Sequence, residues 1–391
     1  MMEKVNVMGN YLSEEQLAYV KAHIQENIDL LAALGRIPAP SHQEDERAAF
    51  VKQWLENVGA AGVYIDEAKN VVYPVACEGN GPVVVIMAHM DIVFPDTTEL
   101  PLRIEDGKMY APGIGDDTAN LVQLLMSAKY VTEKMQEPGW KKPECGIVFV
   151  ANACEEGLGN LKGSRAIVEA FGSRIREFIS FDGYTSFVTN NGVGSHRYEV
   201  TVKTEGGHSY GNFGNANAIY YLSSMIQTLY GKRVPTKAKT TYNVGTITGG
   251  TTVNSIAQEA SMLYEFRSED HDCLEEMEQF FDSVIDAYRR MGIEVLVDVK
   301  GIRPCKKGVD EAALERLTLA NKALVEAFTG ETCQVGANST DSNIPLSMGI
   351  PANTIGVIRG GLAHTRQEWV DLGSVEEGFN IAMAVVQKYF Q

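Results

Sequence analysis

The sequence predicts an α/β protein in which one discontinuous domain is interrupted by a smaller inserted domain. Apolar segments of strand length alternate with amphipathic segments of helix length along most of the chain, and this order changes once, to βαββαβ, before it resumes. The length of 391 residues and the hydrophobic content of 45% suit two domains or one large domain with an insertion.

The first half of the chain supplies strands and helices in alternation. Ser13, followed by two acidic residues, indicates a helix start, and apolar residues then recur at helical spacing at Leu17, Val20, Ile24, Ile28 and Leu31. A second helix is expected to begin near Ser41, and further helices after Asp117 and over 164–170. Strands are expected at 71–76, 83–88, 146–151 and 178–181, the first two as a pair split by the turn at 79–82. This alternation favours a sheet covered on both faces.

A different order of elements begins around Gly192. Strands are expected at 196–203, 241–247, 259–266 and 294–299, with helices over 216–229 and 273–291. This is the split-βαβ pattern of a ferredoxin-like unit. Helices over 310–328 and 375–389 then return to the first pattern. We therefore assign residues 1–191 and 304–391 to one α/β domain and residues 192–303 to an inserted domain.

Composition excludes several classes of partner. The formal net charge of −17 makes nucleic acid and anionic membrane surfaces unfavourable partners. No apolar stretch is long enough to span a bilayer, and residues 1–13 lack the basic start and apolar core of an export signal. The six cysteines are scattered without close pairs, which favours a reducing cytoplasm over a disulfide framework.

Side chains capable of chemistry follow the ends of the expected strands. His89 and Asp91 come directly after the apolar run 83–88. An imidazole can bind zinc through one nitrogen while a carboxylate fixes its tautomer through the other, although Asp91 could instead orient a different ligand. Taken alone, the pair is more simply explained as a solvated strand end.

Acidic residues occupy the neighbouring ends. Asp116 and Asp117 lie in a glycine-bearing turn before a helix, where one of them can cap the helix. Glu155 and Glu156 follow the strand at 146–151, Asp182 ends the strand at 178–181, and His364 lies in a glycine-rich loop. Each has an ordinary surface explanation. Together, carboxylates and two imidazoles at separate strand and loop ends suit two zinc-like ions that share a bridging Asp.

These segments resemble the co-catalytic zinc metallopeptidase family that contains peptidase T, glutamate carboxypeptidase, aminoacylase and succinyl-diaminopimelate desuccinylase. The matching segments occur in family order across almost the whole chain, at 88–91, 115–117, 155–156, 181–183, 206–209 and 363–364. The resemblance implies that Asp116 bridges two Zn²⁺ ions, with Co²⁺ or Mn²⁺ as possible substitutes. It implies that His89 and Asp182 complete one site and that Glu156 and His364 complete the other. Glu155 would be the general base, and Asp91 the partner of His89.

The resemblance also assigns roles within the inserted domain. That domain would be a lid and dimerisation module, so that the chain is expected to be a homodimer. His208 would reach the substrate carbonyl oxygen, and Asn254 and Arg267 would contact the substrate. Many relatives have Lys-Gly after the paired aspartates, and this chain departs from them with Thr118-Ala119 at the start of that helix.

The expected reaction is hydrolysis of an amide bond. Segments 340–343 and 367–369 look closer to peptidase T-like members, which favours an aminopeptidase acting on di- or tripeptides. An N-acyl amino acid deacylase would share the same metal site and remains an alternative. From other classes, a metal-free peptide-binding or scaffold protein is disfavoured by the paired Glu155 and Glu156, and a two-metal phosphatase by the lack of a basic phosphate-cradling loop.

Overall fold

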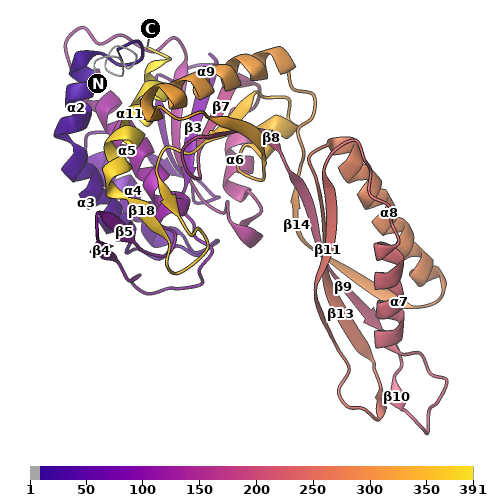
Figure 1. Cartoon of the computed structure of the whole chain (residues 1–391). Coiled ribbons are helices and arrows are strands. Elements are labelled where there is room, and N and C mark those ends of the chain that lie inside the picture. The colour runs from indigo at the N-terminus through magenta and orange to yellow at the C-terminus, as the bar shows by residue number, and fades with distance from the viewer. Residues whose placement is uncertain (1–8, 391) are drawn as a thin grey trace. The chain divides into compact units, whose positions relative to one another are not determined.

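The computed structural model describes residues 9–390, without the side chain of Leu158, and the chain divides into two compact units (Figure 1). Unit 1 comprises Met1–Asn191 and Gly308–Gln391, and unit 2 comprises Gly192–Lys307. The insertion predicted from the sequence starts at the same residue as unit 2 and ends four residues earlier, at Arg303. The start of the chain, residues 1–8, in which no export signal is expected, lies outside the described residues.

Within the described residues, the sheet of unit 1 has the strand order β1-β2-β6-β3-β7-β16-β8-β15. Strand β3 lies near its centre and pairs in parallel with β6 and β7, and β7 pairs in parallel with β16. The strands are β1 (Tyr64–Ile65), β2 (Val71–Val75), β3 (Val83–His89), β6 (Gly146–Asn152), β7 (Ile175–Phe181), β8 (Phe187–Gly192), β15 (Gln334–Asn338) and β16 (Ala352–Ile355). The carboxyl ends of the parallel strands therefore meet at one edge of the sheet.

Helices cover both faces of this sheet, as the sequence predicts. Because successive side chains of a strand point to opposite faces, Val84, Ile86 and Ala88 of β3 pack in one apolar cluster, and its alternate residues pack in another. The helices of unit 1 are α2 (Glu14–Ala22), α3 (Ile24–Leu34), α4 (Asp45–Asn57), α5 (Ala119–Met135), α6 (Lys162–Phe171), α9 (Glu311–Thr329), α10 (Asn343–Ser347) and α11 (Val375–Gln387), with short helical turns at Ile114–Thr118, Gly157–Gly159, Gly172–Arg174 and Leu372–Ser374.

Two local expectations were wrong. The first helix does not continue from Ser13 to Leu31 but breaks at His23, whose φ of −110° and ψ of 13° leave the helical region. The imidazole of His23 lies 2.8 Å from the main-chain oxygen of Tyr19. Strands β2 and β3 do not pair with each other, because β6 lies between them and bonds to both. Apolar spacing reports a buried face, but it does not report a break or the partner of a strand.

A small second sheet in unit 1 was not predicted. It has the order β17-β18-β5-β4, formed by β4 (Arg103–Glu105), β5 (Lys108–Tyr110), β17 (Gly360–Gly361) and β18 (Trp369–Asp371). Residue Trp369 of β18 lies opposite Tyr110 of β5. Two loops that matter for the site, 111–116 after β5 and 362–368 between β17 and β18, therefore leave the same small sheet.

Unit 2 has the ferredoxin-like topology that its element order predicts. Its antiparallel sheet has the order β11-β13-β9-β14, and helices α7 and α8 pack on one face (Figure 1). The elements are β9 (Gly194–Lys203), β10 (Gly207–His208), α7 (Ala218–Tyr230), β11 (Thr240–Gly249), β12 (Ser255–Ile256), β13 (Glu259–Ser268), α8 (His271–Arg290) and β14 (Glu294–Arg303). A second pairing, between β10 and β12, lies next to the Glu259 end of β13.

All six cysteines are free thiols, and only Cys77 has appreciable exposure. Between residues 9 and 390, no helix is both long enough and apolar enough to cross a bilayer.

Candidate metal centre

The sheet of unit 1 brings three of the predicted segments together. His89 is the last residue of β3, the Glu155-Glu156 pair follows the end of β6, and Asp182 follows the end of β7. Because β3 lies between β6 and β7 and runs parallel to both, these three ends are neighbours at one edge of the sheet.

The Asp116 carboxylate lies between two imidazoles. Its Oδ1 is 3.1 Å from Nε2 of His89, and its Oδ2 is 3.1 Å from Nε2 of His364. The same His364 nitrogen is 3.4 Å from Oε1 of Glu156. One carboxylate thus presents each of its oxygens to a different histidine, which is the arrangement that a bridging ligand between two cations requires.

His89 is oriented for coordination through Nε2. Its Nδ1 lies 3.0 Å from the main-chain oxygen of Asp91 and 3.5 Å from Oδ1 of that residue. Since a carbonyl oxygen only accepts hydrogen bonds, Nδ1 carries the proton and the lone pair of a neutral ring is on Nε2. The predicted pairing of His89 with Asp91 therefore involves the main chain of Asp91 more closely than its carboxylate.

The Asp91 carboxylate is used mainly to hold the glutamate loop. The backbone N–H groups of Glu155 and Glu156 donate to its two oxygens at 2.9 Å each. The Ser41 hydroxyl donates to Oδ2 at 2.6 Å. Asp91 therefore fixes the backbone of both the predicted base and a predicted ligand, which is the alternative role that the sequence left open.

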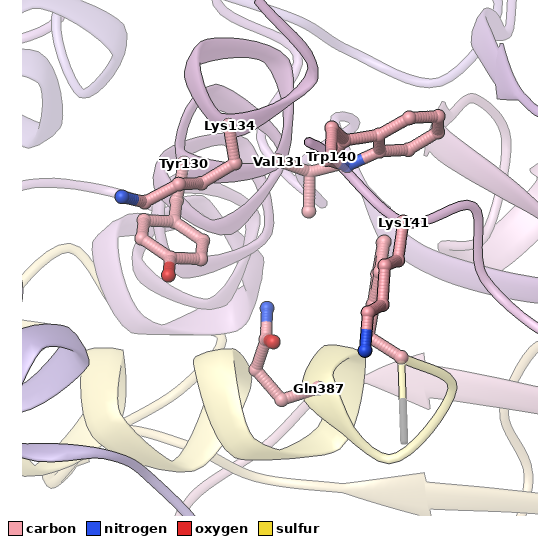
Figure 2. Close-up of a pocket in the computed structure, with 7 residues that line it drawn as sticks. Tyr130, Val131, Lys134, Trp140, Lys141 and Gln387 are labelled. Atoms are coloured by element: carbon pink, nitrogen blue, oxygen red, sulfur yellow. The ribbon is translucent and has the colours of Figure 1, made fainter. Parts of the chain in front are cut away.

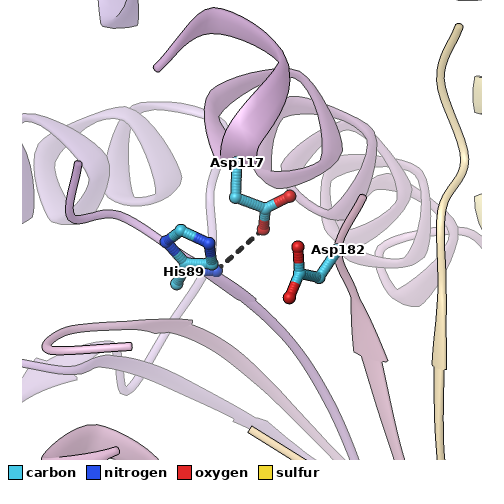
Figure 3. A group of neighbouring side chains, drawn as sticks. All are labelled: His89, Asp117 and Asp182. Carbon is cyan, nitrogen blue, oxygen red and sulfur yellow. Dashed lines mark hydrogen bonds between the residues drawn. The ribbon is translucent and has the colours of Figure 1, made fainter. Parts of the chain in front are cut away.

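A second group consists of His89, Asp117 and Asp182, whose ligand atoms all lie within 4.8 Å of one another. Figure 3 shows the carboxylates of Asp117 and Asp182 facing each other beside His89. Asp117 accepts the backbone N–H of His89 at 3.0 Å and the Asn120 amide at 2.6 Å, so it already has a supporting role. Asp182 is left as the carboxylate of this group that a cation could bind.

Several carboxyl groups lie close together in this cluster, and their negative charges repel one another. Burial raises the pKa of Asp117 and of Asp182 well above the ordinary value, and neighbouring carboxylates add to the effect. Burial, together with the charge of Asp116, raises the pKa of Glu156 to about 7 against the opposing effect of His364.

The neighbouring carboxylates favour the protonated, charged form of both imidazoles. Burial disfavours a charge on His89, but the carboxylates of Asp117, Asp116 and Asp91 outweigh it and raise its pKa well above the usual range. Contacts with Asp116 and Glu156 raise the pKa of His364 to about 10. Burial would raise the pKa of Asp116, but the two imidazoles outweigh it and lower that pKa. The carboxylates of this cluster favour the protonated, positively charged form of both histidines, and the same negative charge would favour bound divalent cations. The carboxylate oxygens and imidazole nitrogens are the ligand types that zinc-like ions bind.

The loops that carry these groups have constrained backbone. His364 and Leu362 have φ of 63°, and Cys154, next to Glu155, has φ of 60°. Residues other than glycine rarely adopt this left-handed conformation, and it is concentrated at functional sites.

Two buried carboxylates in the same region were not predicted as site residues. Asp341 is fully buried and accepts the Asn152 amide at 2.6 Å, and burial raises its pKa to about 8. Glu368 is also fully buried, and it bonds to the backbone of the Asp116 loop. Both lie in segments that resemble peptidase T-like relatives, but their spacing gave no sign of a position beside the cluster.

The predicted residues of unit 2 do not form one group. His208 and Asn254 are neighbours, since the backbone N–H of Ser209 donates to the main-chain oxygen of Asn254 at 2.9 Å. Arg267 pairs with Glu265 near the other end of β13. The eight residue steps from Glu259 to Arg267 span roughly 27 Å of extended strand, so Arg267 is far from the other two within this unit.

A hollow of about 160 Å³ lies at the far end of α5 from Asp116 (Figure 2). Its lining is Tyr130, Val131, Lys134, Trp140, Lys141, Gln387 and Phe390. The Lys134 ammonium pairs with Glu15 and Glu137, and this hollow includes none of the predicted site residues.

Imidazole and carboxylate side chains lie together at the carboxyl ends of the parallel strands. This arrangement is typical of a metal-dependent hydrolase with an α/β fold. The chain belongs to peptidase family M20/M25/M40, whose sequence model matches residues 85–388. This confirms the family and the enzyme class inferred from the sequence motifs.

Similarity to characterised proteins covers nearly the whole chain. A succinyl-diaminopimelate desuccinylase of Corynebacterium glutamicum is 25% identical over 87% of this chain and 90% of its own length. A tripeptidase of Staphylococcus aureus has a similar fold, with a TM-score of 0.74, 19% identity and coverage of 94% and 98% of the two chains. A Bacillus subtilis protein described as a dinuclear metal-binding peptidase of this family has a TM-score of 0.61 at 16% identity, with coverage of 94% and 99%.

Proposed function

We propose that this chain is a peptidase T-like aminopeptidase that hydrolyses an amide bond in short peptides at a centre for two divalent ions, with Zn²⁺ as the expected metal. The observation that carries the proposal is the Asp116 carboxylate, which presents one oxygen to His89 and the other to His364 at 3.1 Å each. Asp182 would complete the His89 side, and Glu156 the His364 side.

The ions would supply a water of lowered pKa and would polarise the scissile carbonyl. Glu155 would accept the proton of the attacking water. This role is supported by its backbone, which the Asp91 carboxylate holds beside Glu156. The same carboxyl group would then return the proton to the leaving amine.

His208 would donate a hydrogen bond to the carbonyl oxygen as negative charge develops there. Its Nδ1 accepts the backbone N–H groups of Tyr210 at 3.3 Å and Gly211 at 3.2 Å. A neutral His208 therefore carries its proton on Nε2, the nitrogen that remains for a substrate. Asn254 is the neighbouring candidate for a substrate contact, and Arg267 the candidate for binding a substrate carboxylate.

A substrate with a free amino group is supported by the tripeptidase whose fold resembles this chain, with a TM-score of 0.74, and by segments 340–343 and 367–369, which look closer to peptidase T-like members.

An N-acyl amino acid deacylase with the same centre is the alternative. It is favoured by the desuccinylase relative, which matches this chain over 87% of its length. The aminopeptidase cleaves an amide whose acyl part carries a free α-amino group, whereas the deacylase cleaves an amide whose acyl part, such as acetyl or succinyl, carries none.

The test is a substrate panel with purified, Zn²⁺-loaded protein. Free di- and tripeptides are compared with N-acetyl and N-succinyl amino acids at equal concentration, and dialysis against a chelator provides the metal-free control. We expect hydrolysis of the peptides that is lost on chelation and restored by Zn²⁺. Turnover of acylated amino acids alone would select the deacylase, and metal-independent turnover would refute the two-metal centre.

We further propose that unit 2 joins two copies of the chain. Strand β11 is an edge of its sheet, and Tyr210 and Phe213 near His208 are each 91% exposed. Light scattering of the eluting protein is expected to give twice the chain mass of 42.8 kDa. A single-chain mass at micromolar concentration would contradict this.

A further inference from the structure

The Glu368 carboxylate accepts three backbone N–H groups of the loop that carries Asp116. Its Oε1 accepts the backbone N–H groups of Gly115 at 2.8 Å and Asp116 at 2.6 Å, and its Oε2 accepts that of Gly113 at 3.0 Å. The residue is fully buried. A buried carboxylate that accepts three backbone donors holds them by charge-assisted hydrogen bonds, which are stronger than bonds between neutral groups.

The small sheet brings Glu368 to this loop. Glu368 precedes Trp369, the first residue of β18, which lies opposite Tyr110 at the end of β5. The chain that leaves β5 becomes the Asp116 loop, and the chain that enters β18 carries His364 four residues before Glu368. One short loop therefore provides both an imidazole beside Asp116 and the carboxylate that holds the Asp116 backbone.

The glycines of the Asp116 loop allow this close approach. A Cβ at Gly115 would lie 2.9 Å from the Tyr184 ring and 3.1 Å from Oε1 of Glu368. Gly113 has a φ of 70°, and a Cβ there would lie 2.2 Å from a methyl carbon of Ile92. A side chain at either position would separate the loop from Glu368 or strain it.

We propose that Glu368 is a positioning residue of the metal centre, which fixes Asp116 between His89 and His364 so that both ions can bind. The inference rests on the proposed two-metal function and adds a residue that touches neither ion. If Glu368 only stabilised the fold, its loss would lower the stability of the metal-free protein and leave the affinity for metal unchanged.

Two substitutions of Glu368 remove different numbers of hydrogen-bond acceptors and should weaken Zn²⁺ binding to different extents. Glu368→Gln keeps one oxygen for Gly115 and Asp116 but turns an NH₂ group toward the N–H of Gly113. Glu368→Leu has a similar volume and removes every acceptor. Because losing a partner that orients a ligand typically weakens metal binding 10- to 100-fold, we expect about 10-fold weaker Zn²⁺ binding for Gln and about 100-fold for Leu.

Zn²⁺ affinity is measured by competition with a chromophoric chelator, and the thermal midpoint of each metal-free protein is measured in parallel. Co²⁺-loaded protein gives a second readout, because the visible absorption of Co²⁺ changes when the ligand geometry changes. Glu177→Gln is the matched control, since this carboxylate accepts the Tyr389 hydroxyl at 2.7 Å on β7, five residues before Asp182. The control is expected to keep wild-type affinity and the wild-type Co²⁺ spectrum.

Wild-type Zn²⁺ affinity in Glu368→Leu would overturn the proposal, whatever happens to the thermal midpoint. If that variant does not fold, wild-type affinity and an unchanged Co²⁺ spectrum in Glu368→Gln would overturn it equally. A wild-type protein that binds neither Zn²⁺ nor Co²⁺ would refute the proposed function instead, so the two failures are distinguishable.

Discussion

His89 and His364 contact the same carboxylate at the same distance, 3.1 Å, but the protein supports them differently. The His89 side chain is 1% exposed, ends a central strand and has its second nitrogen fixed by Asp91. The His364 side chain is 58% exposed and lies in a loop with left-handed backbone. Equal contact distances therefore do not imply equal rigidity: one side of the centre is set by the core, and the other by a loop.

The largest expected effect is the loss of kcat in Glu155→Gln, a variant that separates the chemical step from metal binding. We expect Glu155→Gln to lower kcat by about 10²- to 10⁴-fold, because the variant lacks the proton acceptor, while metal content stays at the wild-type value. Steady-state kinetics and elemental analysis of the same preparation measure the two quantities. Glu156→Gln is the paired control and is expected to lose metal. Near-wild-type kcat in Glu155→Gln would refute the assignment of the base.

The two histidines should differ in their effect on the metal-free fold. Both His89→Ala and His364→Ala are expected to lower metal content. His89→Ala should also destabilise the metal-free protein by about 2–4 kcal/mol, because it leaves a cavity among buried carboxylates, whereas His364→Ala should destabilise it less, because the side chain is 58% exposed and solvent screens its contacts with Asp116 and Glu156. Urea unfolding after chelation measures the difference. Equal losses in the two variants would abolish the contrast between a core side and a loop side.

The variant Asp91→Asn tests how far the backbone of Glu155 and Glu156 depends on the buried Asp91 carboxylate. In Asp91→Asn an NH₂ group must face one of the two N–H groups, of Glu155 or Glu156, that the carboxylate now accepts. We expect activity or metal affinity to fall about 10- to 100-fold. Ser41→Ala, which removes only the hydroxyl donor to the same carboxylate, should have a smaller effect. The prediction fails if the two variants are indistinguishable.

The smallest effect is expected from the surface support of the His364 loop. The Arg366 guanidinium forms two bonds with the Asp96 carboxylate, at 3.1 and 2.7 Å. Since the pair is exposed, Arg366→Gln should weaken metal binding less than about fivefold, and added salt should reduce the difference. A loss as large as that of Asp91→Asn would show that the loop depends on this surface pair.

The predictable parts of the fold follow from burial patterns. The uninterrupted apolar run of β3 identifies a central strand with His89 at its end, and the βαββαβ order identifies the topology of unit 2. The break at His23 and the insertion of β6 between β2 and β3 leave no trace in apolar spacing, because the buried face continues across both.

The gathering of candidate residues was predictable where they stand in short motifs at strand ends. Asp116, Glu155 and Glu156 stand in such motifs, and their residue types predict metal binding and proton transfer. Glu368 acts through three backbone N–H groups more than 250 positions earlier in the chain, and it is placed by strands of only three residues each. Such long-range pairing of very short strands depends on the folded context, so the sequence alone gave no signal for it.

The strand that delivers His89 contributes to the apolar layers on both faces of its sheet. Its amide hydrogens should therefore exchange with solvent only when the whole of unit 1 unfolds, whereas the exposed loop around His364 can open locally. Ions would then enter and leave through that loop, while the end of β3 with His89 keeps its conformation whether or not an ion is bound.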